Sequence, residues 1–349
     1  MPIRMVKDPG NKRSKRKIRT NNQSNLSSSG GSGLGSIISL VLPFLLKKPK
    51  LLLVVVVLGA IGYLFFGKGC SVPNIEGVDV VKNLFQTGGE FNKEKYEETE
   101  IYEPLADNKK NPLPEYVSLL KYAPKRLNQG QQGSCVAWAS AYAARTILES
   151  QRTGENPNSV KFSPSFMYNQ ISLDKRTCQG SYIKLAMDNM MGVGAVPFRD
   201  FVYDEKTCST EPSRQLKAKA QAYKIKGFQR LTEEESRFAS KEMLSIKQNL
   251  SKGSPVIIGM MVGGSFMQNM NGKEVWEPTE DDYSQRGFGG HAMCVIGYDD
   301  SKDGGAFQIM NSWGETWGVD GIGWVRYSDF KAFNIESYGL YPMGNINDK

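Results

Sequence analysis

The 349-residue sequence contains a single histidine, His291, which follows two glycines and opens an apolar stretch. Far upstream, the glycine-containing turn 128–134 runs into an alanine-rich helical pattern that begins at Cys135. Asn311 ends another apolar stretch downstream of the histidine. A fold in which these three polar side chains act together must bring three distant segments of the chain into contact.

Cysteine, histidine and asparagine in this order predict an activated thiol. The thiolate is the nucleophilic form of cysteine, and the first turn of a helix favours negative charge, so Cys135 is well placed. With His291 as its partner, the site is expected to exist largely as a thiolate–imidazolium pair. Asn311 would orient the imidazole. The Gln129 amide and the backbone N–H of Cys135 would bind the oxyanion formed on an attacked carbonyl.

The region 112–349 resembles the papain family of cysteine peptidases. The resemblance implies that a peptide or protein substrate is hydrolysed through a thioester acyl-enzyme, without metal or cofactor, by Cys135, His291, Asn311 and Gln129. Trp313 would cover the His–Asn hydrogen bond. The motifs that carry the resemblance are Leu113–Val117 for the mature amino terminus, Gln129–Ala139 for the nucleophile, and Asn311–Gly314 with Trp317 and Gly318 for the asparagine.

Two positions depart from the nucleophile motif of the family. Gln132 stands where a second cysteine is usual, and Val136 stands where a tryptophan usually follows the nucleophile. Elsewhere, Cys178 and Cys208 match positions that carry disulfide cysteines in the family, which implies a bond between them. Cys294 lies in an apolar strand pattern and is expected in the core.

The resemblance also implies where a substrate binds. The substrate backbone would pair with the main chain at Gly180 and Ser181. The second residue before the cleaved bond would enter a pocket without acidic residues, so an apolar side chain is predicted to be preferred over arginine. The resemblance assigns this pocket to Tyr182, Ile183, Gly259, Gly290 and Ala292.

The pattern along the chain predicts an α+β protein of the papain-like type, with a helical half followed by an antiparallel sheet or barrel half. Helical spacing of apolar residues comes first, and strand-like runs separated by Gly, Asp and Ser turns follow. The predicted helices span 135–150, 182–191 and 233–250, and the predicted strands span 255–261, 292–298, 306–311 and 323–327.

The amino-terminal region carries the basic excess of the chain, since residues 1–68 contain Asp8 as their only acid. Residues 1–36 predict a disordered basic tail. Residues 37–67 predict a membrane segment with one transmembrane helix at about 51–67. The positive charges before it predict a single-pass cell (inner) membrane protein with a cytoplasmic amino terminus and a periplasmic or extracellular catalytic domain. Nucleic-acid binding is not expected, because no basic cluster occurs beyond residue 68.

Several alternatives remain open from the sequence. The membrane segment could be a cleaved signal peptide, and Cys70 could be lipidated. Residues 68–111 are either a spacer or a short pro-segment. The same thiol chemistry would serve an acyl transferase or amidase, and a pseudo-peptidase would bind peptides without cleaving them.

Overall fold

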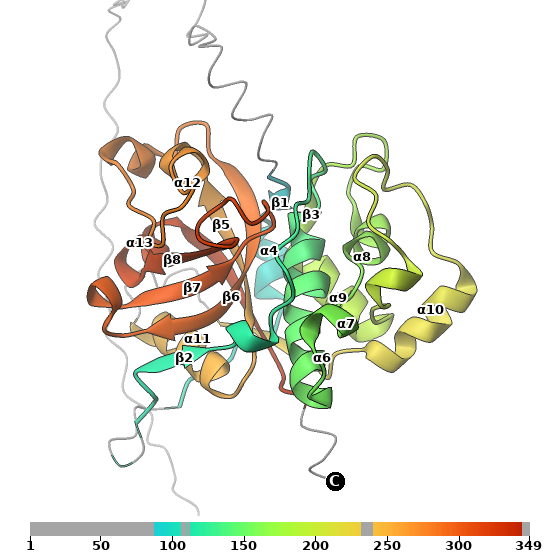
Figure 1. Ribbon diagram of the computed structural model, residues 1–349, viewed down its shortest axis with the longest axis horizontal. Helices are drawn as coiled ribbons and strands as arrows, with labels where there is room; N and C mark the ends of the chain where they lie inside the picture. The colour runs from blue at the N-terminus through green and yellow to red at the C-terminus, as the bar shows by residue number, and fades with distance from the viewer. Residues whose placement is uncertain (1–86, 106–109, 111, 232–239, 344–349) are drawn as a thin grey trace, which may run out of the picture. The chain divides into compact units, whose positions relative to one another are not determined.

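The computed structural model describes residues 87–105, 110, 112–231 and 240–343. Within this part of the chain, a helical half and a sheet half lie side by side, with the central helix at the boundary (Figure 1). The expected transmembrane helix and the tail before it lie outside the described residues. Among the described residues, no helix is long and apolar enough to cross a membrane.

The helical half is built around one long helix that begins at Cys135. It runs through α5 (Cys135–Ala137), a π-helical stretch η2 (Trp138–Arg145) and α6 (Thr146–Thr153), and ends at Gly154, whose φ is +75°. Side chains of Asn156, Ser163 and Ser213 cap three of the other helices. These other helices are α7 (Pro157–Val160), α8 (Pro164–Ile171), α9 (Ile183–Gly192) and α10 (Arg214–Ala220), with short 3-10 turns η1 (Leu120–Tyr122), η3 (Phe198–Asp200) and η4 (Gln221–Tyr223).

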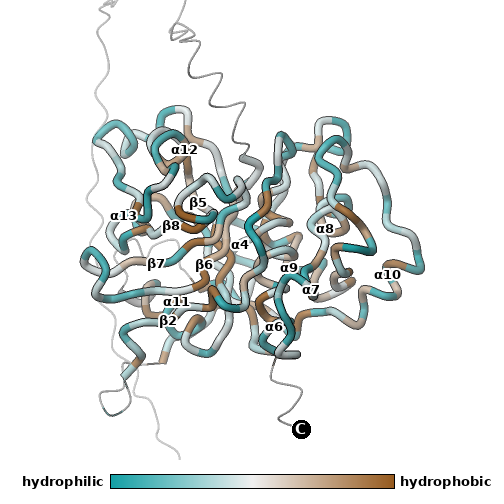
Figure 2. The backbone as a smooth tube through the Cα atoms, in the orientation of Figure 1, coloured by the Kyte–Doolittle hydropathy of each residue, from teal (hydrophilic) through white to brown (hydrophobic). Residues whose placement is uncertain are grey.

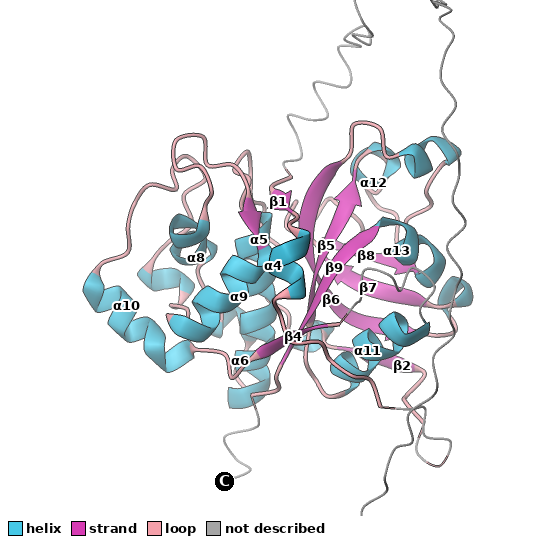
Figure 3. Ribbon diagram, turned by 180° about the vertical axis from the view of Figure 1, so that it is seen from behind, coloured by secondary structure: helices cyan, strands magenta, loops and turns pink. Residues whose placement is uncertain are grey.

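The sheet half is a seven-stranded antiparallel sheet in the order β4-β9-β5-β6-β7-β8, with β2 paired to β6 (Figure 3). Its strands are β2 (Tyr116–Ser118), β4 (Phe228–Arg230), β5 (Val256–Val262), β6 (Gly289–Asp299), β7 (Ala306–Met310), β8 (Ile322–Arg326) and β9 (Asn334–Leu340). The helical elements of this half are α11 (Ser240–Ser251), α12 (Gly264–Gln268) and α13 (Tyr327–Phe333), with the 3-10 turns η6 (Glu280–Ser284) and η7 (Lys302–Gly304). The predicted order of helices before strands is confirmed.

The central helix is buried on every side, which explains its alanine-rich composition. From Cys135 to Ser150 every residue is buried, and small side chains allow the sheet and the other helices to approach closely. Hydrophobic residues are concentrated along β5 and β6, which lie against this helix (Figure 2). The charged residues inside the helix are paired, since Arg145 contacts Glu149 over 2.9 Å and Glu149 also binds Arg152. The helix therefore forms a rigid support for the residue at its amino terminus.

Residues 87–105, which the sequence leaves open as part of a spacer or a short pro-segment, pack on both halves of the fold. Strand β1 (Gly89–Glu90) pairs in parallel with β3 (Ser181–Tyr182), and helix α4 (Lys93–Glu97) follows. Tyr96 of α4 is buried against Tyr338 of β9, with ring centroids 5.1 Å apart. Residues 68–86 lie outside the described part.

Candidate active site

Cys135 lies at the first turn of the central helix, where the sequence predicted it. The turn before the helix places Gly130 at a φ of +63°, and Ser134 accepts the first helical hydrogen bond through its carbonyl. The backbone N–H of Ala292 donates to Sγ of Cys135 over 3.4 Å. Ala292 directly follows His291 on β6, so the nucleophile of the helical half meets the histidine strand of the sheet half.

The imidazole of His291 is oriented by Asn311. Its Nε2 donates to Oδ1 of Asn311 over 2.8 Å, and the same oxygen accepts from the backbone N–H of Ser312. Nδ1 has no hydrogen-bond partner among the described residues, so it is the nitrogen left to exchange a proton with the thiol. Trp313 stacks on the imidazole, with centroids 4.3 Å apart, and shields the His–Asn hydrogen bond as expected.

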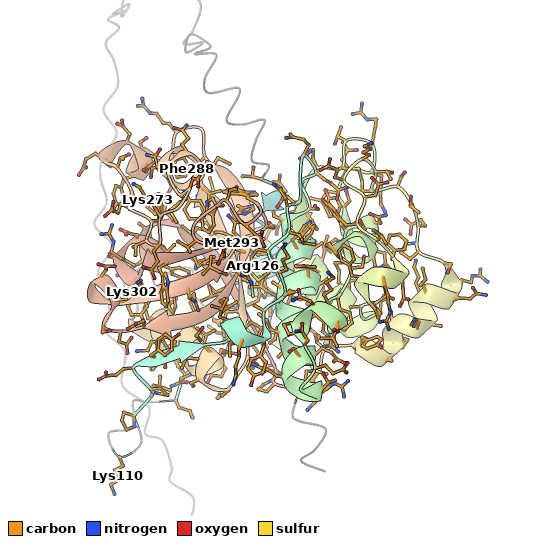
Figure 4. The ribbon with its side chains drawn as sticks, in the orientation of Figure 1. Lys110, Arg126, Lys273, Phe288, Met293 and Lys302 are labelled. Atoms are coloured by element: carbon orange, nitrogen blue, oxygen red, sulfur yellow. A yellow bond between two sulfur atoms is a disulfide. The ribbon has the colours of Figure 1, made fainter. Side chains whose placement is uncertain are left out.

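Gln129 belongs to the same hydrogen-bonded cluster and is buried. Its Oε1 accepts from the hydroxyl of Ser312 over 2.6 Å, and its Nε2 donates to the carbonyl of Gln132 over 2.9 Å. Because Ser312 follows Asn311, the segment that orients the imidazole also orients the Gln129 amide. Met293 on β6 and Arg126, just upstream of the Cys135 turn, mark this junction of the two halves in Figure 4.

Burial controls the charge of the catalytic pair in this structure. Cys135 and His291 are both completely buried. Burial raises the pKa of the Cys135 thiol to about 11, although backbone hydrogen bonds from Ala292, Gly88 and Val136 oppose the rise. Burial likewise lowers the pKa of His291 to about 4, against the opposing effect of Asn311. In this closed arrangement burial therefore favours the neutral pair over the expected thiolate–imidazolium pair.

Residues 87–91 contact both catalytic segments and run through the predicted substrate cleft. The backbone N–H of Gly88 donates to the carbonyl of Gly290 over 3.2 Å, and the N–H of Ser181 donates to the carbonyl of Gly88 over 2.9 Å. This stretch thus connects the predicted substrate-binding strand of the helical half to the predicted pocket strand of the sheet half. Glu90 lies beside Gly180, where a Cβ would be 3.1 Å from the glutamate side chain.

Two of the residues assigned to the main pocket, Gly259 and Gly290, lie against the side chain of Phe91. A Cβ added to Gly259 would lie 2.4 Å from the Phe91 ring and 3.3 Å from Cδ1 of Ile183. A Cβ added to Gly290 would lie 2.9 Å from the same ring. The two glycines leave the space that Phe91 occupies. Tyr182 takes part in the strand pairing next to this pocket, opposite Glu90.

The structure shows the surroundings of the two positions that depart from the family motif. Nε2 of Gln132 donates to the carbonyls of Asp204 and Thr207, so hydrogen bonds hold the loop near the position that a cysteine usually takes. Trp138 packs edge-on against Tyr203 of the same loop, with centroids 4.8 Å apart. Val136 is fully buried.

The described cysteines outside the site are arranged as the sequence suggested. Cys178 and Cys208 form a disulfide bond, with Cα atoms 5.6 Å apart. Cys294 is a free, fully buried cysteine on β6. The disulfide joins the loop that ends at Cys208 to the segment before β3, and Tyr203 in the same loop donates from its hydroxyl to the carbonyl of Gln129 over 2.7 Å.

Sequence reasoning missed three residues of the cleft: Gly88, Phe91 and Glu336. The consecutive glycines Gly88 and Gly89 were the available signal. Because glycine has no Cβ, two glycines in a row can indicate that the backbone passes close to another backbone segment. Glu336 is buried on β9 directly opposite Gly259, so the expectation of a pocket without acidic residues is wrong. Strand β9 was not predicted, and only its pairing with β5 shows that the Glu336 carboxylate lies next to Gly259.

Comparison with known proteins supports the same assignment. A family model described as papain family cysteine protease matches residues 121–343. An uncharacterized peptidase C1-like protein of Acanthamoeba polyphaga mimivirus is 27% identical over 222 residues, which are 62% of this chain and 69% of that protein. Cathepsin K of Mus musculus is 25% identical over 219 residues, 62% of this chain and 60% of its own length.

Among solved structures, xylellain, a cysteine protease from Xylella fastidiosa, has the same fold. It aligns with a TM-score of 0.60 at 24% identity and covers 76% of this chain and 97% of that one. The family model, which matches more than half of the sequence, carries the assignment. The chain belongs to the papain family of cysteine proteases, a family of hydrolases.

Proposed function

We propose that this protein is a membrane-anchored cysteine peptidase held inactive by its own residues 87–105. The observation that carries the proposal is the convergence of Cys135, His291 and Asn311 beneath a strand that fills the substrate cleft. The catalytic roles are the ones that the family resemblance implied from the sequence. The cover explains why the site is buried.

The reaction follows from the positions of the side chains. Nδ1 of His291 takes the proton of the Cys135 thiol, and Sγ attacks the carbonyl carbon of the peptide. The oxyanion that forms is bound by the backbone N–H of Cys135 and the amide of Gln129. The C–N bond breaks as the imidazolium returns its proton to the departing amine, which leaves a thioester on Cys135.

Hydrolysis of the thioester uses the same groups in reverse order. Nδ1 of His291 takes a proton from a water molecule, and the resulting hydroxide attacks the thioester carbonyl. The thiol leaves with the proton held by the imidazole, and the acid product is released. Asn311 keeps Nε2 protonated throughout, so Nδ1 remains the exchanging nitrogen.

Residues 87–105 act as a short pro-segment in this proposal. The stretch is too short for a separate folded domain. Its strand β1 nevertheless contacts both walls of the cleft, and its helix α4 packs on β9. The hydroxyl of Tyr96 donates to the carbonyl of Ser337 over 3.2 Å, and Arg230 binds the carbonyl of Thr99 over 2.9 Å. Substrate reaches Cys135 only after residues 87–91 have left the cleft.

The proposed location follows from the sequence before the described residues. Residues 51–67 form the membrane anchor, the basic tail stays in the cytoplasm, and the peptidase domain faces the periplasm or cell exterior. The Cys178–Cys208 disulfide supports an oxidising compartment. A reporter that functions only outside the cytoplasm, fused after residue 111, should be active. A cytoplasmic peptidase domain would contradict this topology.

The test of the proposed chemistry compares two cysteines in the full-length protein. On a Gly88→Ala background, where a Cβ at residue 88 would overlap the Gly133 backbone and open the cleft, Cys135→Ala is expected to abolish hydrolysis of a fluorogenic peptide, while Cys294→Ala, which removes the other free cysteine among the described residues, is expected to keep it. Circular dichroism would check that both variants fold. Full hydrolysis by Cys135→Ala would overturn the proposal.

A further inference from the structure

The two groups proposed to bind the oxyanion come from the two ends of one turn. The side-chain amide of Gln129 lies near its start, and the backbone N–H of Cys135 belongs to the peptide unit that joins Cys135 to Ser134. Between them the turn contains Gly130, whose φ is +63°, and Gly133. Because glycine restricts the backbone less than any other residue, the distance between the two donors depends on contacts from outside the turn.

The hydroxyl of Tyr203 provides such contacts at both ends of the turn. It donates to the backbone carbonyl of Gln129 over 2.7 Å, and it lies 2.8 Å from Oγ of Ser134. Since the carbonyl takes the single phenolic proton, the oxygen of Tyr203 accepts from the Ser134 hydroxyl. Ser134 is fully buried, so its hydroxyl finds its partner within the protein. A chain of two hydroxyls therefore connects the two ends of the turn.

Tyr203 is itself held in place from several sides. Its ring packs edge-on against Trp138 of the central helix, with centroids 4.8 Å apart. The disulfide bond between Cys178 and Cys208 fastens the end of its loop. Gln132, which stands where a cysteine is usual in the family, donates from Nε2 to two carbonyls of the same loop over 3.2 and 3.1 Å. Hydrogen bonds from this loop thus fix the turn in place of a disulfide bond to residue 132.

We propose that Tyr203 is a positioning residue of the peptidase, and that its hydroxyl sets the distance between the two oxyanion donors. The inference rests on the proposed function and adds a residue to the machinery of the same site. Tyr203 acts through Gln129 and Ser134 and takes no part in proton transfer. Burial raises the pKa of Tyr203 to about 12, so the hydroxyl keeps its proton and remains a donor at neutral pH.

Loss of the hydroxyl should slow one reaction of Cys135 and spare another. Acylation by a peptide passes through a tetrahedral intermediate, whose negatively charged oxygen needs both donors in place. Alkylation by iodoacetamide displaces iodide from a saturated carbon and forms no oxyanion. A general loss of structure around the thiol would slow both reactions. The comparison of the two rates therefore isolates the oxyanion site.

The test uses the full-length protein with Gly88→Ala, in which the cleft is expected to open. Tyr203→Phe keeps the ring and removes the hydroxyl. Single-turnover acylation by a fluorogenic peptide should become about tenfold slower, as for the loss of one hydrogen bond, with KM unchanged. The rate of alkylation of Cys135 by iodoacetamide should stay the same. Ser134→Ala removes the other hydroxyl of the chain and should show the same selective effect, so the test does not depend on one variant folding.

Tyr142→Phe is the matched control. The ring of Tyr142 also packs on Trp138, with centroids 4.7 Å apart. Its hydroxyl, however, donates over 2.6 Å to the carbonyl of Lys125, which precedes the turn. Tyr142→Phe should therefore leave the rates of acylation and alkylation unchanged.

The outcomes separate the inference from the proposed function. Acylation of Tyr203→Phe and Ser134→Ala at the rate of the Gly88→Ala protein would overturn the inference and leave the peptidase activity standing. Equal slowing of acylation and alkylation would also overturn it, because Tyr203 would then support the fold in general. Alkylation without any acylation of the Gly88→Ala protein itself would contradict the proposed function, and the inference with it.

Discussion

Gly88 lies so close to Gly133 that a Cβ on residue 88 would be 2.2 Å from the Gly133 carbonyl oxygen and 2.6 Å from its Cα. Both atoms belong to the backbone of the turn that leads into Cys135, so they cannot move aside without disturbing the nucleophile. The cleft can therefore close in this way only if residue 88 is a glycine.

Gly88→Ala should consequently open the cleft. Overlap of this kind costs about 1–3 kcal/mol, which would increase the open population roughly tenfold. Peptide hydrolysis by the full-length protein should rise by about the same factor. Gly192→Ala is the control, because a Cβ there meets nothing within 4 Å. Equal rates for Gly88→Ala and wild type would contradict the inhibitory role of residues 87–105.

The reactivity of the thiol should report the same closure. Because burial raises the pKa of Cys135 to about 11, little thiolate is present at neutral pH in the closed protein. Alkylation of Cys135 by iodoacetamide should therefore be slow at pH 7 and accelerate as the pH rises toward 11. In Gly88→Ala the rise should occur at lower pH. Identical pH profiles for the two proteins would show that the strand does not control the thiol.

The supporting residues should affect catalysis unequally. Gln129→Ala removes one oxyanion donor and should lower kcat about 10²-fold. Asn311→Ala removes the group that orients His291, yet leaves proton transfer in place, so measurable hydrolysis should remain. Single-turnover kinetics on the Gly88→Ala background would measure both effects. A Gln129→Ala enzyme with unchanged kcat would exclude its amide from the oxyanion site.

Glu336 should make stability depend on pH. Its pKa rises from 4.5 to about 8 in the folded protein, so the folded state holds the proton more tightly than the unfolded state. This contribution to the free energy of unfolding is complete below about pH 4.5 and is lost as the pH rises toward 8. Urea unfolding should show the wild type losing stability relative to Glu336→Gln across this range, by up to about 1.4 kcal/mol per unit. Parallel curves would mean that Glu336 is not buried as described.

Much of the fold could be predicted from the sequence because its strongest signals are local. The alanine-rich pattern after Cys135 predicted the central helix, and runs of β-branched and apolar residues predicted β5, β6, β7 and β8. The order of Cys135, His291 and Asn311 likewise predicted which segments meet.

The residues that close and shape the cleft could not be found in this way. Phe91 and Glu336 belong to short or weakly patterned segments, and their importance arises from strand pairing across long sequence separations. The effect of burial on the charge of the catalytic pair could not be predicted for a related reason. It depends on which distant segments pack over Cys135 and His291, and no local pattern reveals them.

The central claim, that Cys135 is the nucleophile of a peptidase, is tested most directly by covalent labelling. The full-length Gly88→Ala protein would be treated with an epoxide inhibitor of thiol proteases, and the adduct would be located by mass spectrometry. The account predicts one adduct, on Cys135, and its loss in a protein that also carries His291→Ala. An adduct on Cys294, or none on Cys135 while peptide hydrolysis continues, would contradict it.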